Sequence, residues 1–239
     1  MENPQPLAGK AAIVTGASRG IGLAITRSVG RLGARVSICA RDPQRLESAV
    51  ESLRKEGFEA DGWTADVSKP HSVAAFVARS RKAFGPIDIL VNNAGKGLFR
   101  SAHLLTIEEW DELLDTNLKS VFLMCREVVP EMIQRGSGQI INISSLAGKN
   151  SFAGGGAYCA SKWGLLGLTR CMSEELRDSG IRVSAVCPGS VATDFMHGSS
   201  RDTSKMLQPE DVAHAVEMIL TQGPHSFLSE ISIRPTQKP

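Results

Sequence analysis

The sequence lacks the cysteine and histidine patterns that metal centres and disulfide frameworks require. Its cysteines number five and form no C-x-x-C pair, and its five histidines show no metal-ligand spacing. An odd number of cysteines without a pattern is typical of free thiols in a reducing compartment. We therefore expect no metal site and a cytoplasmic protein.

Long hydrophobic runs and an excess of one charge are also missing. No apolar stretch approaches the roughly 18 residues that span a bilayer, and residues 1–10 lack the apolar core of a signal peptide. The formal net charge is only +2, and the lysines and arginines form no cluster. Neither a membrane nor a nucleic acid is therefore an expected partner.

Aromatic residues are scarce, at 5% of 239 residues, and only one of them is a tyrosine, Tyr158. Any chemistry that needs a phenol therefore has a single candidate. Hydrophobic residues make up 42% and charged residues 22%, which is ordinary for a globular protein and excludes a disordered chain.

Short apolar runs alternate with stretches of helical periodicity along the sequence. The runs predict seven strands, at residues 11–15, 35–40, 62–66, 87–91, 139–143, 181–187 and 229–233. The stretches between them predict helices at 21–32, 42–56, 72–84, 107–135, 158–179 and 209–221. Repetition of strand, helix and strand predicts parallel pairing with right-handed crossovers. We expect an α/β fold, a doubly wound (Rossmann) seven-stranded parallel sheet flanked by helices on both faces. Residues 1–239 are expected to form a single domain, with polar residues 194–208 as a lid loop over the substrate.

A glycine-rich turn joins the first strand to the first helix, with the sequence TGASRGIG at residues 15–22. Glycines let the backbone approach a pyrophosphate, and the helix that follows offers unpaired N–H groups and the positive end of its dipole. The spacing is G-x-x-x-G-x-G rather than G-x-G-x-x-G, and a tight turn between strand and helix would use the same glycines. The strand before the turn and the helix after it favour a dinucleotide site.

The residue that ends the second strand bears on the choice of dinucleotide. An acidic residue there binds the ribose 2′-hydroxyl of NAD, but this sequence has Ala40 followed by Arg41. Arg41 and Arg19 could pair with a 2′-phosphate, which predicts NADP(H) in preference to NAD(H); a solvated charge at the strand end is the alternative for Arg41. Asp42 either neutralises part of the Arg41 charge or caps the next helix ahead of Pro43.

Tyr158 and Lys162 stand four residues apart in a predicted helix and so share one face. An ammonium beside a phenol favours the phenolate and lowers the tyrosine pKa from its usual value near ~10. The pair predicts a general acid for carbonyl reduction and a base for alcohol oxidation. The same spacing also arises by chance as an exposed helical pair, so its position in the fold decides.

Polar residues follow the fourth and fifth predicted strands, at the sheet edge where ligands bind. Residues 92–95 read NNAG after the fourth strand, and Ser144 and Ser145 come directly after the fifth. Asn117 lies inside a predicted helix, where asparagine has poor propensity and needs a reason. Their position at one edge favours the catalytic interpretation of Tyr158 and Lys162.

Together these motifs resemble the short-chain dehydrogenase/reductase family in its compact form, and among its members the bacterial 3-oxoacyl-carrier-protein reductases. They occur in the family's order: TGASRGIG at 15–22, Asp66, NNAG at 92–95, Asn117, Ser145, Tyr158 with Lys162, and Pro188-Gly189. The resemblance implies an oxidoreductase that transfers a hydride between NADP(H) and a carbonyl or secondary alcohol. A general carbonyl reductase for small metabolites and a catalytically silent dinucleotide-binding regulator are the alternatives.

The resemblance also implies a role for each matching residue. Tyr158 corresponds to the proton donor, and Ser145 corresponds to the serine that hydrogen-bonds the substrate oxygen, with Ser144 as the competing assignment. Lys162 corresponds to the residue that holds the nicotinamide ribose and lowers the tyrosine pKa, and the Asn117 backbone would help hold a water against it. The implied cofactor site comprises Gly16, Ser18, Arg19, Gly20, Ile21, Gly22, Arg41, Asp66, Val67, Asn93, Ala94, Gly95, Tyr158, Lys162, Pro188, Gly189, Val191 and Thr193.

The sequence departs from the family at its C-terminal end. Many members have a Gly-Gly segment before the last strand, whereas residues 229–239 here read SEISIRPTQKP. Because that end helps form one subunit interface in the family, both a homodimer and a homotetramer stay open. We expect pairing through helices 107–135 and 158–179, whose apolar residues exceed one stripe: Val121, Phe122, Met124, Val128, Val129, Leu165, Leu166 and Leu168.

Several residues near the predicted cleft have two interpretations. His197 either touches the substrate or is a solvated loop histidine. The others wall an apolar substrate pocket or pack in the core: Phe99, Phe152, Phe195 and Met196.

Overall fold

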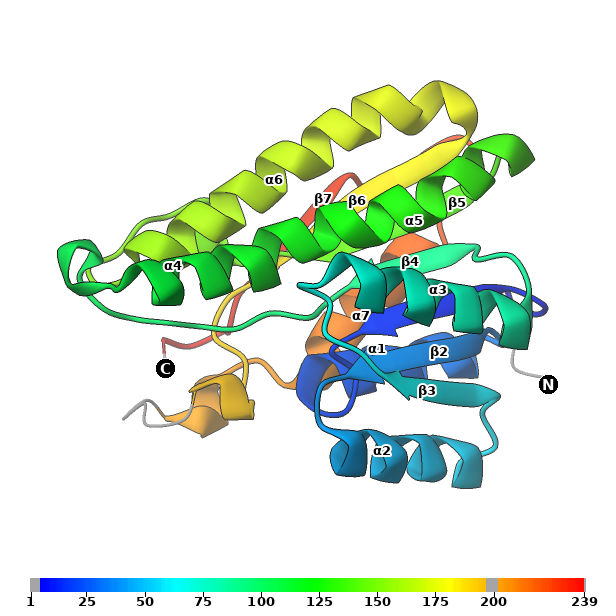
Figure 1. Ribbon diagram of the computed structural model, residues 1–239, viewed down its shortest axis with the longest axis horizontal. Helices are drawn as coiled ribbons and strands as arrows, with labels where there is room; N and C mark the ends of the chain where they lie inside the picture. The colour runs from blue at the N-terminus through cyan, green and yellow to red at the C-terminus, as the bar shows by residue number, and fades with distance from the viewer. Residues whose placement is uncertain (1–4, 197–201, 239) are drawn as a thin grey trace.

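Seven parallel strands form one sheet in the described part of the chain, and helices cover both of its faces (Figure 1). The computed structural model describes residues 5–196 and 202–238. The strands are β1 (Ala11–Thr15), β2 (Arg35–Ala40), β3 (Ala60–Thr64), β4 (Ile89–Asn92), β5 (Gly138–Ile143), β6 (Ile181–Pro188) and β7 (Glu230–Ile233). The expected doubly wound α/β fold is confirmed.

The strand order is β3-β2-β1-β4-β5-β6-β7, so the direction of winding switches between β1 and β4. β1 pairs in parallel with β2 on one side and with β4 on the other, and Val14 aligns with both Ile38 and Val91. In such sheets ligands bind outside the carboxyl ends of the strands at the switch point. The topology therefore places the candidate site beyond Thr15 and Asn92.

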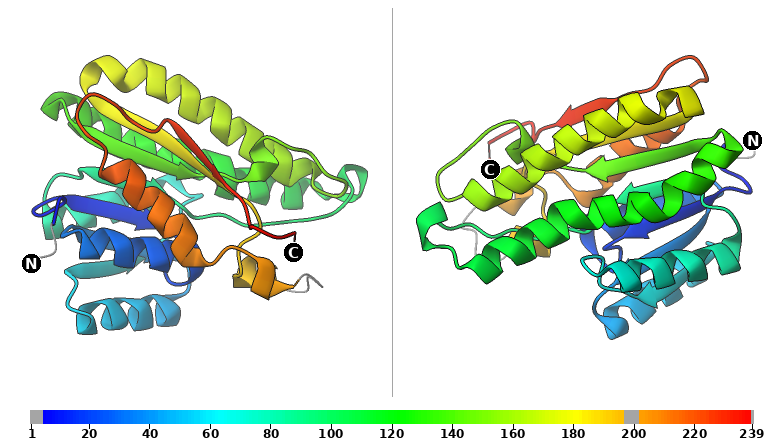
Figure 2. Two further views of the ribbon diagram at one scale, coloured as in Figure 1. Left: turned by 180° about the vertical axis from the view of Figure 1, so that it is seen from behind. Right: turned by 45° about the horizontal axis from the view of Figure 1, so that its top comes forward.

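Two layers of helices bury the sheet. One layer holds α1 (Gly20–Arg31), α2 (Pro43–Lys55) and α7 (Pro209–Leu220), and the other holds α3 (Pro70–Phe84), α5 (Ser120–Arg135) and α6 (Gly156–Leu176). Figure 2 shows α1 and α7 in front in its left view and α5 and α6 in front in its right view. All five residues of β1 are buried, because a strand covered on both faces has no solvated side. No helix in the described ranges has the length and apolarity to cross a membrane.

Local sequence sets where the helices begin. The Asp42 carboxylate accepts a hydrogen bond from the Arg45 N–H at 3.1 Å, and Pro43 takes the first helical position of α2. Asp42 is therefore a helix cap, which was one of its two predicted roles. A reciprocal capping box between Thr106 and Glu109 starts α4 (Ile107–Leu114).

Most predicted bounds differ from the observed ones by one to three residues, and two of the differences bear on the site. β3 lies two residues earlier than the predicted strand 62–66, because β2 pairs with Ala60–Thr64, and Asp66 consequently lies just past the strand. The predicted helix 107–135 is interrupted: α4 ends at Leu114, and a π-helical turn, Asp115–Lys119, leads into α5. Such turns are frequent at functional sites, and this one contains Asn117.

Candidate active site

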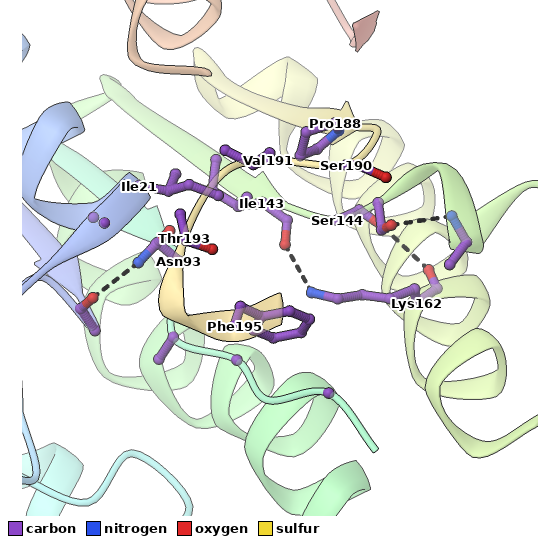
Figure 3. Close-up of a pocket in the computed structure, with 18 of the residues that line it drawn as sticks. Ile21, Asn93, Ile143, Ser144, Lys162, Pro188, Ser190, Val191, Thr193 and Phe195 are labelled. Atoms are coloured by element: carbon purple, nitrogen blue, oxygen red, sulfur yellow. Dashed lines mark hydrogen bonds between the residues drawn. The ribbon is translucent and has the colours of Figure 1, made fainter. Parts of the chain in front are cut away.

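A cleft opens at the carboxyl edge of the sheet, outside β1 and β4 (Figure 3). Its volume is about 1730 Å³. Typical small-molecule sites occupy roughly 300–1,000 Å³, so this cleft has room for a dinucleotide together with a second molecule. Every residue of the predicted site lines the cleft except Asn117.

The turn between β1 and α1 presents its backbone to the cleft. Gly20 has a φ of 56°, in the left-handed region that favours glycine. A Cβ on Gly16 would lie 2.8 Å from the Ala94 Cα, and one on Gly22 would lie 2.5 Å from the Gly16 carbonyl oxygen. The N-cap residue Arg19 makes no side-chain capping bond, so the first N–H groups of α1 remain available to an anion.

The end of β4 is tied to this glycine turn. The Asn93 Nδ2 donates to the carbonyl oxygens of Thr15 at 2.9 Å and Gly16 at 3.1 Å. The N–H groups of Asn93 and Ala94 both donate to the Thr15 hydroxyl at 3.0 Å. These bonds fix residues 93–95 as one wall of the cleft, as Figure 3 shows for Asn93.

Asp66 and Val67 line the cleft just after β3. The Asp66 Oδ1 accepts hydrogen bonds from the Ser68 N–H at 3.0 Å and the Ser68 hydroxyl at 2.7 Å. Burial raises the pKa of Asp66, but the Ser68 bonds and the charges of Arg41 and Lys69 outweigh burial and hold the pKa below its usual range. The ionised carboxylate thus fixes the turn that presents Val67.

Both arginines predicted to select a 2′-phosphate line the cleft, and each contacts a carboxylate. Arg19 forms an ion pair with Asp194, and the Arg41 guanidinium lies 3.8 Å from the Glu112 carboxylate of α4. Asp42 is not the partner of Arg41 because it caps α2. The Arg41 side chain is 65% exposed, so its ion pair is weak and can give way to a stronger anion.

Tyr158 lies in the first turns of α6, at the cleft, with only 8% of its surface exposed. Its ring centroid lies 5.4 Å from that of Phe99 and 5.9 Å from that of Phe195. Burial raises the pKa of Tyr158 to about 12, and a hydrogen bond with Ser145 lowers it by less. The predicted lowering of this pKa is therefore wrong for the protein alone, because burial disfavours the phenolate and the Ser145 hydrogen bond offsets only part of that effect. The phenol is neutral at physiological pH.

The structure distinguishes the two serines that follow β5. The Ser145 hydroxyl stands beside the Tyr158 phenol and accepts a hydrogen bond from the Ala147 N–H at 3.1 Å. The buried Ser144 hydroxyl instead donates to the Lys162 carbonyl oxygen at 3.3 Å (Figure 3). Of the two hydroxyls, only that of Ser145 hydrogen-bonds the phenol.

Lys162 reaches from α6 to the end of β5, where its Nζ donates to the Ile143 carbonyl oxygen at 2.9 Å (Figure 3). The Nζ also lies 6.0 Å from the centroid of the Tyr158 ring. Burial lowers the pKa of Lys162 to about 8, so the amine is still mostly protonated at neutral pH. Its remaining N–H bonds can serve groups in the cleft.

Asn117 lies behind the cleft and is 1% exposed. Its Oδ1 accepts a hydrogen bond from the Lys96 N–H at 2.8 Å, and its Nδ2 donates to the Lys96 carbonyl at 2.9 Å and the Ser161 hydroxyl at 3.0 Å. A Cβ on Gly95 would lie 3.3 Å from the Asn117 Oδ1 and 3.7 Å from the Lys162 Nζ. The side chain therefore joins the segment after β4 to α6, close to the lysine.

The segment after β6 forms another side of the cleft. Val191 forms an isolated bridge with Leu207, which holds the two ends of the predicted lid loop 194–208 against each other. Within that loop, residues 197–201, His197 among them, lie outside the described residues. The cleft-lining residues of this segment include Pro188, Gly189, Val191 and Thr193.

The phenylalanines near the cleft line it rather than fill the core. Phe99, Phe152 and Phe195 are 48%, 47% and 39% exposed, and the ring centroids of Phe99 and Phe152 lie 6.0 Å apart. The side chain of Met196 lies outside what the structure describes. Sequence reasoning missed the C-terminal segment 234–238, which also lines the cleft. Its basic residues after the last predicted strand were the available signal.

Known proteins resemble this chain in both sequence and architecture. The sequence profile of the family described as short chain dehydrogenase matches residues 10–204. The chain is 46% identical over 192 residues to the granaticin polyketide synthase putative ketoacyl reductase 1 of Streptomyces violaceoruber, covering 80% of this chain and 71% of that protein.

Solved structures of similar oxidoreductases have the same fold. A metagenomic short-chain oxidoreductase in complex with NADP has a TM-score of 0.86 and 46% identity, covering 97% of this chain and 99% of that chain. A variant of actinorhodin polyketide ketoreductase with NADPH has a TM-score of 0.88 and 34% identity, covering 95% and 96%. On this evidence of sequence, fold and site, the protein belongs to the short-chain dehydrogenase family and is an oxidoreductase.

Proposed function

We propose that this enzyme uses NADPH to reduce a ketone to a secondary alcohol, with Tyr158 as the proton donor. The observation that carries the proposal is the neutral phenol of Tyr158, held in the cleft beside the Ser145 hydroxyl with the Lys162 ammonium behind it.

The residues of the cleft fit a dinucleotide of the NADP type. The uncapped N-terminus of α1 and the side-chain-free glycine turn suit a pyrophosphate. Arg19 and Arg41 suit a 2′-phosphate, and Val67 suits an adenine face. The NADP and NADPH bound in the two similar structures support this choice. When bound, the nicotinamide supplies the hydride, and selection against NAD(H) is part of the proposal.

The side chains of the cleft would then donate and replace the proton that the reduction requires. Hydride addition turns a ketone oxygen into an alkoxide, which needs a donor within hydrogen-bond reach. The Ser145 hydroxyl would hold that oxygen while the Tyr158 phenol releases its proton to it. The Lys162 ammonium would stabilise the phenolate left behind, and a water held by the Asn117 backbone against Lys162 would return the proton.

The substrate half of the cleft suits an apolar body. Phe99 and Phe195 contact the Tyr158 ring, and Phe152 contacts Phe99. All three phenylalanine rings are only partly buried, so a substrate would cover exposed apolar surface there. The relative from the granaticin polyketide synthase is named as a ketoacyl reductase, which supports a 3-oxoacyl substrate carried as a thioester. A general carbonyl reductase would use the same walls for smaller ketones.

We also propose a cytoplasmic homodimer or homotetramer. Most of the apolar residues predicted for the interface instead belong to the core, among them Val121, Met124 and Leu165. The large apolar side chains that α5 and α6 leave in solvent are Phe122, which was predicted for the interface, at 50%, and Ile133 at 45% and Trp163 at 54%, which were not. These three support pairing through the outer faces of the two helices.

Consumption of NADPH in the presence of a carbonyl panel tests the proposed activity. The panel contains a small diketone, an aryl ketone and a 3-oxoacyl thioester, each assayed with NADPH and with NADH. We expect turnover with NADPH, fastest for the carbonyls with an apolar body. Tight NADPH binding without turnover of any carbonyl would contradict the proposal and favour a dinucleotide-binding regulator.

A further inference from the structure

The C-terminal segment 234–238 forms a wall of the cleft beside the loop that follows β6. The Gly189 N–H donates to the Ile233 carbonyl oxygen at 2.9 Å, and a Cβ on Gly189 would lie 3.0 Å from the Pro235 Cδ. Figure 2 shows the segment running from β7 past the carboxyl edge of the sheet toward the turn at 194–196. The segment is therefore packed against the site.

Two basic side chains of this wall, Arg234 and Lys238, have no carboxylate partner among the residues that the structure describes. The other exposed basic side chains that line the cleft are paired: Arg19 with Asp194, Arg41 with Glu112, and Arg45 with Asp42. The positive charge of the C-terminal wall is thus the part that the described carboxylates leave uncompensated.

The acidic residues that line the cleft, Asp194 of the neighbouring turn among them, already bind basic or hydroxyl groups. Their partners are known: Asp42 binds Arg45, Asp66 binds Ser68, and Asp194 binds Arg19. The wall at 145–153, which carries Ser145 and Phe152, contributes only apolar and neutral polar groups to the lining. A negatively charged group would therefore meet attraction on this side of the cleft and little repulsion.

We propose that Arg234 and Lys238 recognise a carboxylate or phosphate on the substrate. The preferred substrates are then ketones whose apolar body packs against Phe99 and Phe152 and whose far end is anionic. This inference rests on the proposed function, because it names the substrate class of the same site. Each exposed charge contact contributes only modestly to binding, and two acting together correspond to about a tenfold preference for an anionic ketone over a neutral one.

Three aryl ketones with one shared body test the inference: para-acetylbenzamide, which is neutral, para-acetylbenzoate and para-acetylphenyl phosphate. The ratio of kcat/KM for each anionic ketone over the neutral one is measured with NADPH for wild type and for R234Q/K238Q. The matched control is R79Q/K82Q, which removes an arginine and a lysine from the exposed face of α3, away from the cleft.

We expect a ratio of about ten for at least one anionic ketone in wild type and in the control, and a ratio near one in R234Q/K238Q. The ratio should shrink at high salt, because ions screen exposed charges. Comparison of the two anions identifies the carboxylate or the phosphate as the group recognised. A ratio near one in wild type, or an unchanged ratio in R234Q/K238Q, would overturn the inference.

Two binding titrations separate the inference from the proposed function. If none of the ketones is reduced, the proposed function fails, and titration of para-acetylbenzoate and para-acetylphenyl phosphate into the NADP⁺-loaded proteins still decides anion recognition. Wild type and the control should bind at least one of them more tightly than R234Q/K238Q does. Weaker NADPH binding by R234Q/K238Q than by the control would assign these cations to the cofactor instead, and would overturn the inference.

Discussion

Replacement of Arg41 by glutamine tests the electrostatic basis of cofactor choice. A charge-assisted hydrogen bond contributes about 1.5–3 kcal/mol, and the 65% exposure of Arg41 places this contact at the low end. Binding of a 2′-phosphate also breaks the contact with Glu112 at 3.8 Å, which costs less than about 1 kcal/mol. The net loss in R41Q is therefore about 1 kcal/mol, or roughly a fivefold weaker affinity for NADPH.

Calorimetric titration of NADPH and NADH into wild type, R41Q and E112Q measures this effect. NADH affinity should change little in R41Q, since NADH has no 2′-phosphate, and R41D should shift the preference further toward NADH. E112Q should act in the opposite direction and raise NADPH affinity by up to about threefold, because Arg41 loses its competing partner. Equal affinities of wild type for the two dinucleotides, or equal losses for both in R41Q, would refute this reasoning.

Three further predictions concern folding and assembly. G22A should lower the free energy of unfolding by about 1–3 kcal/mol and abolish NADPH binding, because the new Cβ would lie 2.5 Å from the Gly16 carbonyl oxygen; urea denaturation and titration measure both effects. Burial lowers the Lys162 pKa from 10.5 to about 8, so the penalty of charging it in the fold is fully present below pH 8 and is relieved as pH rises from about 8 toward 10.5. K162M removes this penalty together with one hydrogen bond, so it should raise the free energy of unfolding at pH 7 by on the order of 1 kcal/mol. If K162M is stabilised over wild type by the same amount at about pH 9.5, this account is contradicted. Wild type should be at least a dimer by light scattering at micromolar concentration, and F122S/W163S should dissociate; a monomeric wild type would exclude the interface.

The sequence was sufficient for the sheet and for most of the cleft, because both depend on local signals. Apolar runs such as β1 mark the strands, and glycine-rich turns such as 15–22 mark where strands end. Parallel topology then brings the carboxyl ends of the strands to one edge of the sheet. The Asp42 cap was likewise foreseen as one of two roles, because Pro43 follows it directly. Where a residue's role depends on its near neighbours in the chain, the prediction was close.

Features that depend on distant partners were not predictable. The Tyr158 pKa was expected to fall because Lys162 is its sequence neighbour, whereas burial raises it. The ring contacts of the buried Tyr158 include Phe99 and Phe195, which lie on other segments of the chain. The ion pairs of Arg19 and Arg41 join segments far apart in the chain. The π-helical turn at 115–119 likewise depends on bonds from Asn117 to the segment after β4 and to α6, which no helical periodicity reveals.

The measurement that tests the central claim most directly is the turnover of Y158F with NADPH and a good ketone substrate. Removal of the phenolic hydroxyl leaves the ring in its contacts with Phe99 and Phe195, so the fold and NADPH affinity should survive. General acid–base groups contribute about 10²–10⁴-fold, so kcat should fall by at least that factor. A deuterium isotope effect with deuterated NADPH establishes that hydride transfer limits the rate. If Y158F then keeps more than about a tenth of wild-type turnover, another group donates the proton, and the account of this active site is contradicted.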